Sequence, residues 1–249
     1  MIRRILRWTL RLLMGVVILS LAGVFFYRWI PIPFTPLMVI RSIEAITSPS
    51  AQNSKLRYDW ASWEEISLQF PIAIIASEDQ LFAEHNGFDF EAIEKAIEHN
   101  QRSKRQRGAS TISQQVAKNV FLWPGRSWIR KGLEVGFTVM IEAFWPKKRI
   151  LEVYMNIAEL GPLVFGAEAA AQYHFGKSAK QLNGGEAALL AAVLPNPIKM
   201  NAGKPSGYVL RRKAHIQRQV GFFNGIEYLK VFTDKPVEKT TRKKRKKDS

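Results

Sequence analysis

The residues best suited to acid–base chemistry are Glu78 and Asp79, which follow directly after the apolar run Ile72 to Ala76. Charged side chains in such a place need a cleft or a partner, because a buried charge must be paired or neutralised. A glutamate that a cleft holds partly out of water can take up a proton as a general base near neutral pH. An isolated Glu-Asp pair more often only ends a helix at the surface, and a lone histidine such as His85 is more often structural. The pair by itself does not decide between these interpretations.

A second cluster of polar side chains lies between Gly108 and Asn119 and suits phosphates and sugar hydroxyls. Thr111-Ile112-Ser113-Gln114 has the spacing of a capping box, so we expect a helix to begin near Thr111. The free N–H groups of its first turn would lie beside Ser110 and could bind an anion. Four side chains share one side of this helix: Thr111, Gln114, Gln115 and Lys118. A solvated face of an amphipathic helix has the same pattern, so the segment alone is ambiguous.

Arg130, Lys131 and Glu134 form a third cluster, with Glu134 one helical turn after both cations. Side chains at this spacing lie on one helix face. Two cations suit a diphosphate leaving group, and the carboxylate could orient it or bind a metal ion. A surface ion pair has the same spacing and contributes only about 0.2–0.5 kcal/mol. The spacing leaves both interpretations open.

The segments around these clusters predict helices and little sheet. Asp89 is placed to cap a helix that carries Phe90, Ile93 and Ile97 at helical spacing. Ser127 is placed to cap a long helix that runs towards Trp145. Further helices are expected over Lys147–Ile157, Ala167–Tyr173 and Glu186–Leu194. There is no internal repeat and no strong hairpin signal, so we expect a mainly α domain.

The N-terminal region predicts a single membrane-spanning helix. Leu12 to Tyr27 is an uncharged, mostly apolar run between Arg11 and Arg28. It covers about 24 Å at about 1.5 Å per residue, and snorkelling arginines with flanking apolar residues extend it towards the bilayer core of about 30 Å. More arginines precede the run than follow it, which places the N-terminus in the cytoplasm. A cleaved signal peptide is the alternative, but no A-x-A cleavage site follows the run.

The chain is therefore expected to have three parts. Residues 1–45 contain the cytoplasmic N-terminus, the membrane helix over about residues 10–30 and a connector in which Pro31, Pro33 and Pro36 prevent the helix from continuing. Residues 46–228 form the folded domain. Residues 229–249 are a tail, predicted to be disordered, in which Arg242 to Lys247 are all basic. The apolar patch Leu37 to Ile40 in the connector either rests on the bilayer or packs on the domain.

Composition narrows the choice of partner. Lys and Arg number 37 against 21 Asp and Glu, which gives a formal net charge of +16. This surplus favours a polyanion, which could be nucleic acid, an anionic membrane surface or a phosphorylated substrate. The chain has no cysteine, so disulfides, thiolate metal sites and a cysteine nucleophile are excluded.

Five segments together resemble the five motifs of the biosynthetic peptidoglycan glycosyltransferases, which occur in class A penicillin-binding proteins and their monofunctional relatives. The matching residues are E-D-x-x-F-x-x-H-x-G-x-D from Glu78, G-A-S-T-I-S-Q-Q-x-A-K-N from Gly108, R-K-x-x-E from Arg130, R-I-L-E-x-Y-x-N from Arg149 and L-P-N-P from Leu194. They occur in the order of the family. Ala109 stands where bifunctional members usually have glycine, and the monofunctional ones resemble this chain there.

The resemblance implies a lysozyme-like helical fold with two lobes around a cleft beside the membrane. It implies that Glu78 is the base that removes the proton from the 4-hydroxyl of the N-acetylglucosamine on lipid II, while Glu134 is the second essential carboxylate. The oxygen of the deprotonated 4-hydroxyl then attacks the anomeric carbon of the growing lipid-linked chain. The reaction inverts that carbon and expels undecaprenyl pyrophosphate.

The resemblance also indicates which residues bind substrate. Positions that hold donor phosphates and sugar are matched by Ser110, Gln115, Lys118, Asn119, Arg130 and Lys131, and we predict that Asp79, Thr111 and Gln114 bind substrate with them. No cofactor is required by the sequence, although a divalent cation, Mg²⁺ or Mn²⁺, assists several members. Proteins of cell-wall synthesis or division are candidate partners.

Two rival functions remain. A peptidoglycan-cleaving, lysozyme-like or lytic enzyme also uses a cleft glutamate but needs no pyrophosphate clamp. A nucleic-acid-binding or membrane-scaffold protein would use basic runs such as Arg102 to Arg107 and Arg242 to Lys247. The orientation of the anchor puts both runs outside the cytoplasm, so we expect contact with anionic lipid headgroups and not with nucleic acid.

A second enzymatic domain is not expected. The sequence contains neither Ser-x-x-Lys nor Lys-Thr-Gly, and few residues follow Pro197. The protein is therefore predicted to be monofunctional, lengthening glycan strands at the outer side of the cytoplasmic membrane without cross-linking them.

Overall fold

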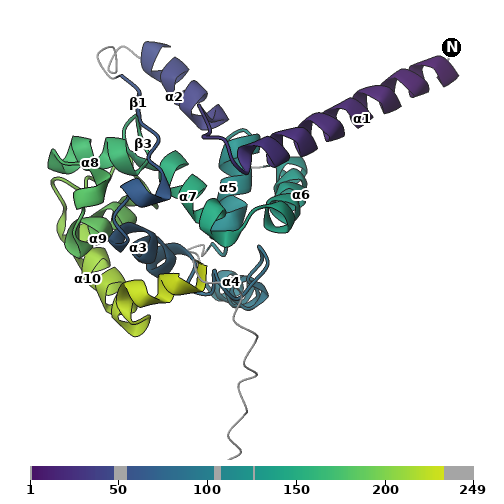
Figure 1. Cartoon of the computed structure of the whole chain (residues 1–249). Helices are drawn as coiled ribbons and strands as arrows, with labels where there is room; N and C mark the ends of the chain where they lie inside the picture. The colour runs from purple at the N-terminus through teal and green to yellow at the C-terminus, as the bar shows by residue number, and fades with distance from the viewer. Residues whose placement is uncertain (1, 48–54, 104–107, 126, 233–249) are drawn as a thin grey trace, which may run out of the picture.

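The computed structural model describes residues 2–47, 55–103, 108–125 and 127–232, and in them it is mainly helical, as predicted (Figure 1). The helices are α1 (Ile2–Tyr27), α2 (Pro36–Thr47), α3 (Gln69–Glu78), α4 (Phe90–Arg102), α5 (Ile112–Phe121), α6 (Trp128–Phe144), α7 (Lys147–Ile157), α8 (Ala167–Phe175), α9 (Gly184–Val193) and α10 (Gly207–Phe222). Short 3₁₀ segments are η1 (Trp63–Glu65), η2 (Ala179–Gln181) and η3 (Gly225–Phe232).

The N-terminal helix α1 projects away from the rest of the molecule, and only its C-terminal end lies against the domain (Figure 1). Its segment Arg3–Tyr27 is long and apolar enough to cross a membrane, with a mean hydropathy of 2.1 and 6% of the most apolar window buried. The predicted anchor helix is confirmed as a membrane-span candidate. Helix α1 begins at Ile2, before the apolar run Leu12 to Tyr27 from which it was predicted. The arginines near the N-terminus are also part of the helix.

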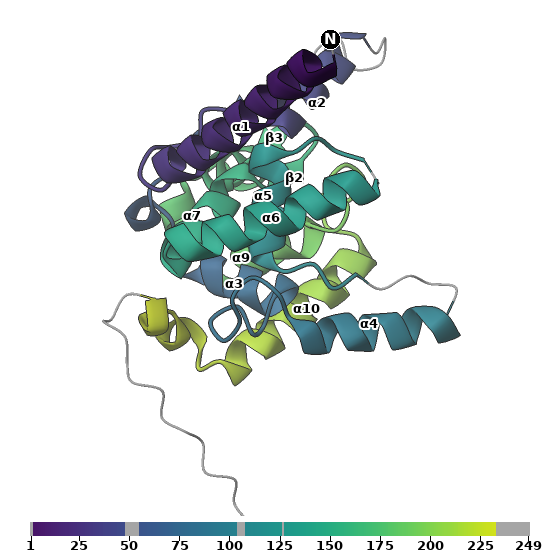
Figure 2. The same ribbon diagram turned by 90° about the vertical axis from the view of Figure 1, so that its right-hand side faces the viewer.

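The centre of the domain is built from helices that are apolar on most sides. In α3 every residue from Phe70 to Ala76 is buried, and α3 packs between α9, α10 and α7. Helix α5 packs against α6 on one side and α7 on another (Figure 2). Because α3, α5 and α7 meet in the core, side chains at their ends are held in fixed relative positions.

The predicted helix starts are confirmed by their hydrogen bonds. Asp89 Oδ1 accepts from Ala92 N at 2.8 Å at the start of α4, and Ser127 Oγ accepts from Arg130 N at 3.1 Å at the start of α6. Thr111 and Gln114 form the predicted capping box of α5. The stripe on α4 does not face the core, however, since Phe90 is 76% and Ile97 is 55% exposed.

Little sheet was predicted and little is found, but the positions of the strands were not predicted. Strands β1 (Arg57–Tyr58), β2 (Glu159–Gly161) and β3 (Val164–Phe165) lie in the order β1-β3-β2, and β2 and β3 form an antiparallel hairpin. The sequence shows no strong hairpin signal, so the β2–β3 hairpin was not predicted. Strands of two or three residues are too short to show alternation, and the turn depends on Leu163, which has a φ of 58°.

The predicted connector is partly helical. Helix α2 begins at Pro36, which suits the first turn of a helix because its missing N–H would have no partner there. Met38 of the apolar patch is fully buried, whereas Val39 is 43% exposed, so the patch divides between the domain and the surface. At the other end, η3 continues the fold past residue 228 with Leu229 buried. The basic run Arg242 to Lys247 and residues 104–107 lie outside the described residues.

Candidate active site

Glu78 is the last residue of α3, and its half-buried carboxylate lies on the wall of a cleft of about 830 Å³. Ser77 Oγ donates a hydrogen bond to Glu78 Oε1 at 3.0 Å, and Gln115 Nε2 donates to Oε2 at 3.1 Å. Both oxygens are therefore oriented by neighbours, and among the described residues no cation forms an ion pair with them. A carboxylate in this state can accept a proton from a group that enters the cleft.

The cleft is bordered by segments that are distant in the sequence. Its wall includes the end of α3, the segment Gly108 to Thr111, the first turn of α4, and Tyr208 and Arg212 of α10. Ser110 is exposed at this border, as expected of a residue that can reach a ligand. The N–H groups expected to be free at the start of α5 are largely engaged within the protein, because Thr111 N donates to Gln114 Oε1, Ile112 N to Asp79 Oδ2 and Gln114 N to Thr111 Oγ1.

Asp79 holds the start of α5 against the end of α3. It is 6% exposed; its Oδ2 accepts from Ile112 N at 3.0 Å, and its Oδ1 lies 2.8 Å from His85 Nε2. Because His85 Nδ1 accepts from Gly87 N at 3.1 Å, the ring proton resides on Nε2 and is donated to Asp79. Both carboxylate oxygens thus bond within the protein, and a substrate-binding role for Asp79 stays a prediction.

Thr111 and Gln114 are also engaged in internal bonds. Thr111 Oγ1 donates to Gly87 O at 2.7 Å, and Gln114 Oε1 accepts from Thr111 N at 3.0 Å. The two residues are 2% and 4% exposed. They shape the start of α5, while direct contact with substrate stays a prediction for both.

Tyr154 is a site residue that the sequence did not reveal. Its hydroxyl donates to Gln115 Oε1 at 3.2 Å, which orients the Gln115 amide so that Nε2 faces Glu78. Burial raises the pKa of Tyr154 well above its ordinary value, so the hydroxyl keeps its proton and stays a donor. The signal in the sequence was the fourth motif from Arg149, which contains this tyrosine, but residue chemistry alone assigned it no role in the site.

Two members of the third cluster, Arg130 and Glu134, are buried and not exposed as a surface ion pair would be, whereas Lys131 is partly exposed. Arg130 Nη1 donates to Glu134 Oε2 at 2.7 Å, and Lys131 Nζ bonds to the other carboxylate oxygen. Arg130 and Glu134 are 8% and 3% exposed. Within the described residues, Arg130 Nε is buried without a hydrogen-bond partner. The cluster therefore keeps a cationic donor that the protein does not satisfy.

Lys118 links the three clusters. Burial lowers the pKa of Lys118, and the charges of Glu134, Arg130, Lys131 and Glu78 also act on its ammonium group. Lys118 lies on α5 and is half-buried, as is its neighbour Asn119. The structure thus gathers the predicted catalytic and cationic residues from three separate helices.

A protein-only metal site is not found in the part of the chain that the structure describes. No group of three or more His, Asp or Glu side chains there could hold a metal ion. Glu134, the acidic residue nearest the cations, is already engaged with Arg130 and Lys131.

Comparisons with known proteins identify the family of the chain. A family model described as Transglycosylase matches residues 44–220. The chain is 50% identical over 247 residues to the biosynthetic peptidoglycan transglycosylase of Bacteroides thetaiotaomicron, covering 99% of this chain and 98% of that one. It is 54% identical over 204 residues to the protein of that name from Pasteurella multocida, covering 82% of each. For the one from Pseudomonas aeruginosa, the identity is 50% over 229 residues, covering 92% of this chain and 98% of the relative. The chain therefore belongs to the transglycosylase family.

Proposed function

We propose that the protein is a monofunctional peptidoglycan glycosyltransferase that polymerises lipid II into glycan strands. The observation that carries this proposal is the Glu78 carboxylate, oriented by Ser77 and Gln115 in a cleft, with the ammonium of Lys118 close enough to interact electrostatically with both Glu78 and Arg130. The curated relatives are named for the same activity. A base beside a cationic pocket suits a reaction that joins an alcohol to a sugar and releases a diphosphate.

In the proposed reaction, Glu78 takes the proton from the 4-hydroxyl of the N-acetylglucosamine on the incoming lipid II. The new bond forms between that oxygen and the anomeric carbon of the growing chain, with inversion. The bond between the anomeric carbon and the phosphate oxygen breaks, and undecaprenyl pyrophosphate leaves with the bonding electrons. The cations stabilise the negative charge that develops on the leaving group.

The cationic cluster is prepared for such an anion in two ways. The desolvated ammonium of Lys118 regains favourable interactions when a phosphate replaces the lost water, which would raise its lowered pKa. Arg130 Nε offers a buried donor that a phosphate oxygen could satisfy. Glu134 balances the charge of Arg130 and Lys131 and keeps both side chains in place when no anion is bound.

The membrane placement completes the proposal. The apolar helix α1 would cross the cytoplasmic membrane with its arginine-rich end in the cytoplasm and the domain on the outer, periplasmic side. Basic residues would contact anionic lipid headgroups. Proteins of cell-wall synthesis or division are proposed partners, and a Mg²⁺ or Mn²⁺ ion bound through the diphosphate is a proposed aid to its departure.

The rival lytic activity is separated from this proposal by one comparison. The full-length protein is incubated in parallel with lipid II and with preformed, undecorated glycan strands, and the products are sized by electrophoresis. Polymer from lipid II with intact glycan supports the proposal. Shortened glycan and no polymer would establish the lytic enzyme instead.

A further inference from the structure

The C-terminal end of the membrane helix is capped by side chains of the domain. The last carbonyl groups of a helix lack partners within it. In α1, Phe25 O accepts from Arg28 N at 3.3 Å and Phe26 O accepts from Trp29 N at 3.1 Å. Two further carbonyls are bound by the domain, Val24 O by Trp145 Nε1 at 2.7 Å and Tyr27 O by Arg149. We call Trp145 and Arg149 the anchor cap.

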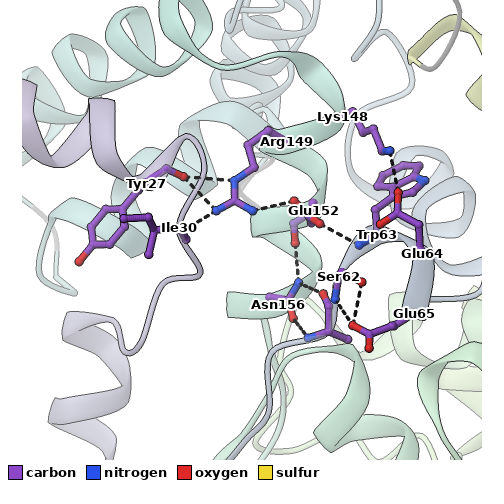
Figure 3. Close-up of polar contacts among 11 residues, drawn as sticks. Tyr27, Ile30, Ser62, Trp63, Glu64, Glu65, Lys148, Arg149, Glu152 and Asn156 are labelled. Atoms are coloured by element: carbon purple, nitrogen blue, oxygen red, sulfur yellow. Dashed lines mark hydrogen bonds and ion pairs between the residues drawn. The ribbon is translucent and has the colours of Figure 1, made fainter.

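Arg149 makes the most contacts in the anchor cap. Its Nε and Nη2 donate to Tyr27 O at 3.1 and 3.0 Å, and Nη2 also donates to Ile30 O at 2.6 Å (Figure 3). Its Nη1 donates to Glu152 Oε2 at 2.7 Å. A planar guanidinium can bind these acceptors together, and its charge favours the negative end of the α1 dipole. A lysine could not reproduce this geometry.

The segment that follows α1 is attached to the domain as well. Ile32 is fully buried, and the Tyr58 hydroxyl donates to Ile32 O. Burial raises the pKa of Tyr58 to about 12, so this donor is not lost at any ordinary pH. The join between anchor and domain is therefore a packed, hydrogen-bonded contact and not a free linker.

Helix α7 carries this contact into the catalytic domain. Glu152, the partner of Arg149, accepts from Trp63 N at 2.8 Å, and Asn156 bonds both N and O of Ala61 (Figure 3). On the same helix, Tyr154 orients Gln115 and through it Glu78. One rigid helix thus connects the end of the membrane anchor to the catalytic carboxylate.

We propose that Arg149 is a positioning residue that fixes the height and tilt of the cleft above the bilayer. This inference rests on the proposed function, in which the diphosphate of the substrate is held at the membrane surface by its lipid tail. A rigid anchor keeps Lys118 and Arg130 at the depth of that diphosphate. With a loose anchor the domain samples many orientations, and the effective concentration of the diphosphate at the cleft falls.

The first test measures the rigidity of the join in the full-length protein in lipid nanodiscs. Because the chain has no cysteine, Gly15→Cys in α1 and Ala214→Cys in α10 give two specific spin-label positions. Electron–electron double resonance should show a narrow distance distribution. In Arg149→Met/Glu152→Gln, which removes the ion pair but keeps an acceptor for Trp63 N, the distribution should broaden. An equally narrow distribution would refute the proposal.

Lys148→Met is the matched control. Lys148 is the neighbour of Arg149 on α7, but its ammonium lies 3.1 Å from Glu64 Oε1 and over the Trp63 ring, away from α1. This variant should keep the narrow distribution. Arg149→Lys, which keeps the charge but not the planar fork, should broaden it and serves if the double variant does not fold.

The second test separates positioning from general stability. Polymerisation by the double variant should fall about tenfold with lipid II in nanodiscs, because the effective concentration is lost, but less than about threefold with a short-chain lipid II analogue in detergent. Equal losses on both substrates would leave Arg149 a purely structural role and overturn the proposal. If the unaltered protein polymerises neither substrate, the proposed function fails. The distance measurement would still test whether the anchor cap holds α1 rigidly against the domain.

Discussion

At the scale of single residues, Gln115 lies between a buried donor, Tyr154, and the proposed catalytic carboxylate of Glu78. Its amide is held by the Tyr154 hydroxyl on one side and bonds Glu78 on the other. The sequence predicted Glu78 and Gln115 as site residues but could not show that they touch, because they lie on different helices. The orientation of both side chains depends on the Tyr154 hydroxyl, and only the packing of the core reveals this contact.

Tyr154→Phe tests this dependence. Removing the hydroxyl leaves Gln115 Oε1 without its partner, and the loss should lower stability by about 1 kcal/mol. We also expect kcat to fall several-fold with little change in KM, because Glu78 is misoriented and substrate contacts remain. Tyr173→Phe on the exposed face of α8 is the control and should change neither value. Lower stability with full kcat would mean that Tyr154 serves packing only.

The lowered pKa of Lys118 predicts a specific pH dependence of kcat/KM. Burial lowers its pKa, and only the protonated amine can bind a diphosphate. The alkaline limb of the kcat/KM profile should therefore begin below the pH at which an exposed lysine loses its proton. Lys118→Arg, which stays charged, should move this limb to higher pH even if its maximum is lower. An unchanged limb would show that another group controls it.

The same shift has a consequence for folding. Since the folded-state pKa of Lys118 lies below that of the unfolded chain, the unfolded chain binds more protons between the two values. Stability should rise with pH across that window. At neutral pH the buried charge opposes folding, so Lys118→Met should raise the thermal unfolding midpoint while it lowers activity.

At the scale of elements, the residues at which helices start were predictable from the sequence. Which face of a helix packs against the core was not. Asp89, Thr111 and Ser127 cap α4, α5 and α6 as their side-chain chemistry indicates. Capping is local, so the sequence contains the necessary information. The exposure of the α4 stripe and the short β2–β3 hairpin depend on contacts with distant segments, which no local pattern records.

Asp79→Asn tests whether motif residues position α5 or bind substrate. The change places an amide N–H opposite the His85 N–H and should destabilise the protein by about 1–2 kcal/mol. Each kcal/mol should lower the unfolding midpoint by about 2–4 °C. We expect little change in KM for protein that remains folded. Asp89→Asn, an equivalent cap on α4, should have almost no effect. A large rise in KM with an unchanged midpoint would instead assign Asp79 to the substrate.

At the scale of the whole molecule, the apolar helix α1 is the feature that suggests a membrane anchor. The apolar run predicted α1, but nothing in the sequence indicated that its last turn docks onto Trp145 and Arg149, more than 100 residues later. Contacts between such distant residues follow from the fold as a whole. The hydropathy pattern suggests an anchor separate from the domain, whereas the structure joins the end of α1 to the domain through these hydrogen bonds.

The basic C-terminal residues give a prediction at this scale. Deleting residues 239–249, which removes the run Arg242 to Lys247, should weaken binding of the protein to vesicles that contain anionic lipid. Each basic residue near such a surface contributes about 1 kcal/mol, and the effect should fade at high salt. Binding to neutral vesicles should not change. Equal binding to anionic vesicles with and without the segment would exclude this role.

The most direct test of the central claim compares the parent protein with Glu78→Gln in a lipid II polymerisation assay. Glutamine can keep the hydrogen bonds to Gln115 and Ser77, because the Ser77 hydroxyl can rotate to accept one, so the fold should be retained. Loss of a general base should reduce turnover by about 10²–10⁴-fold with an unchanged unfolding midpoint. Turnover equal to that of the parent protein would show that Glu78 is not the base.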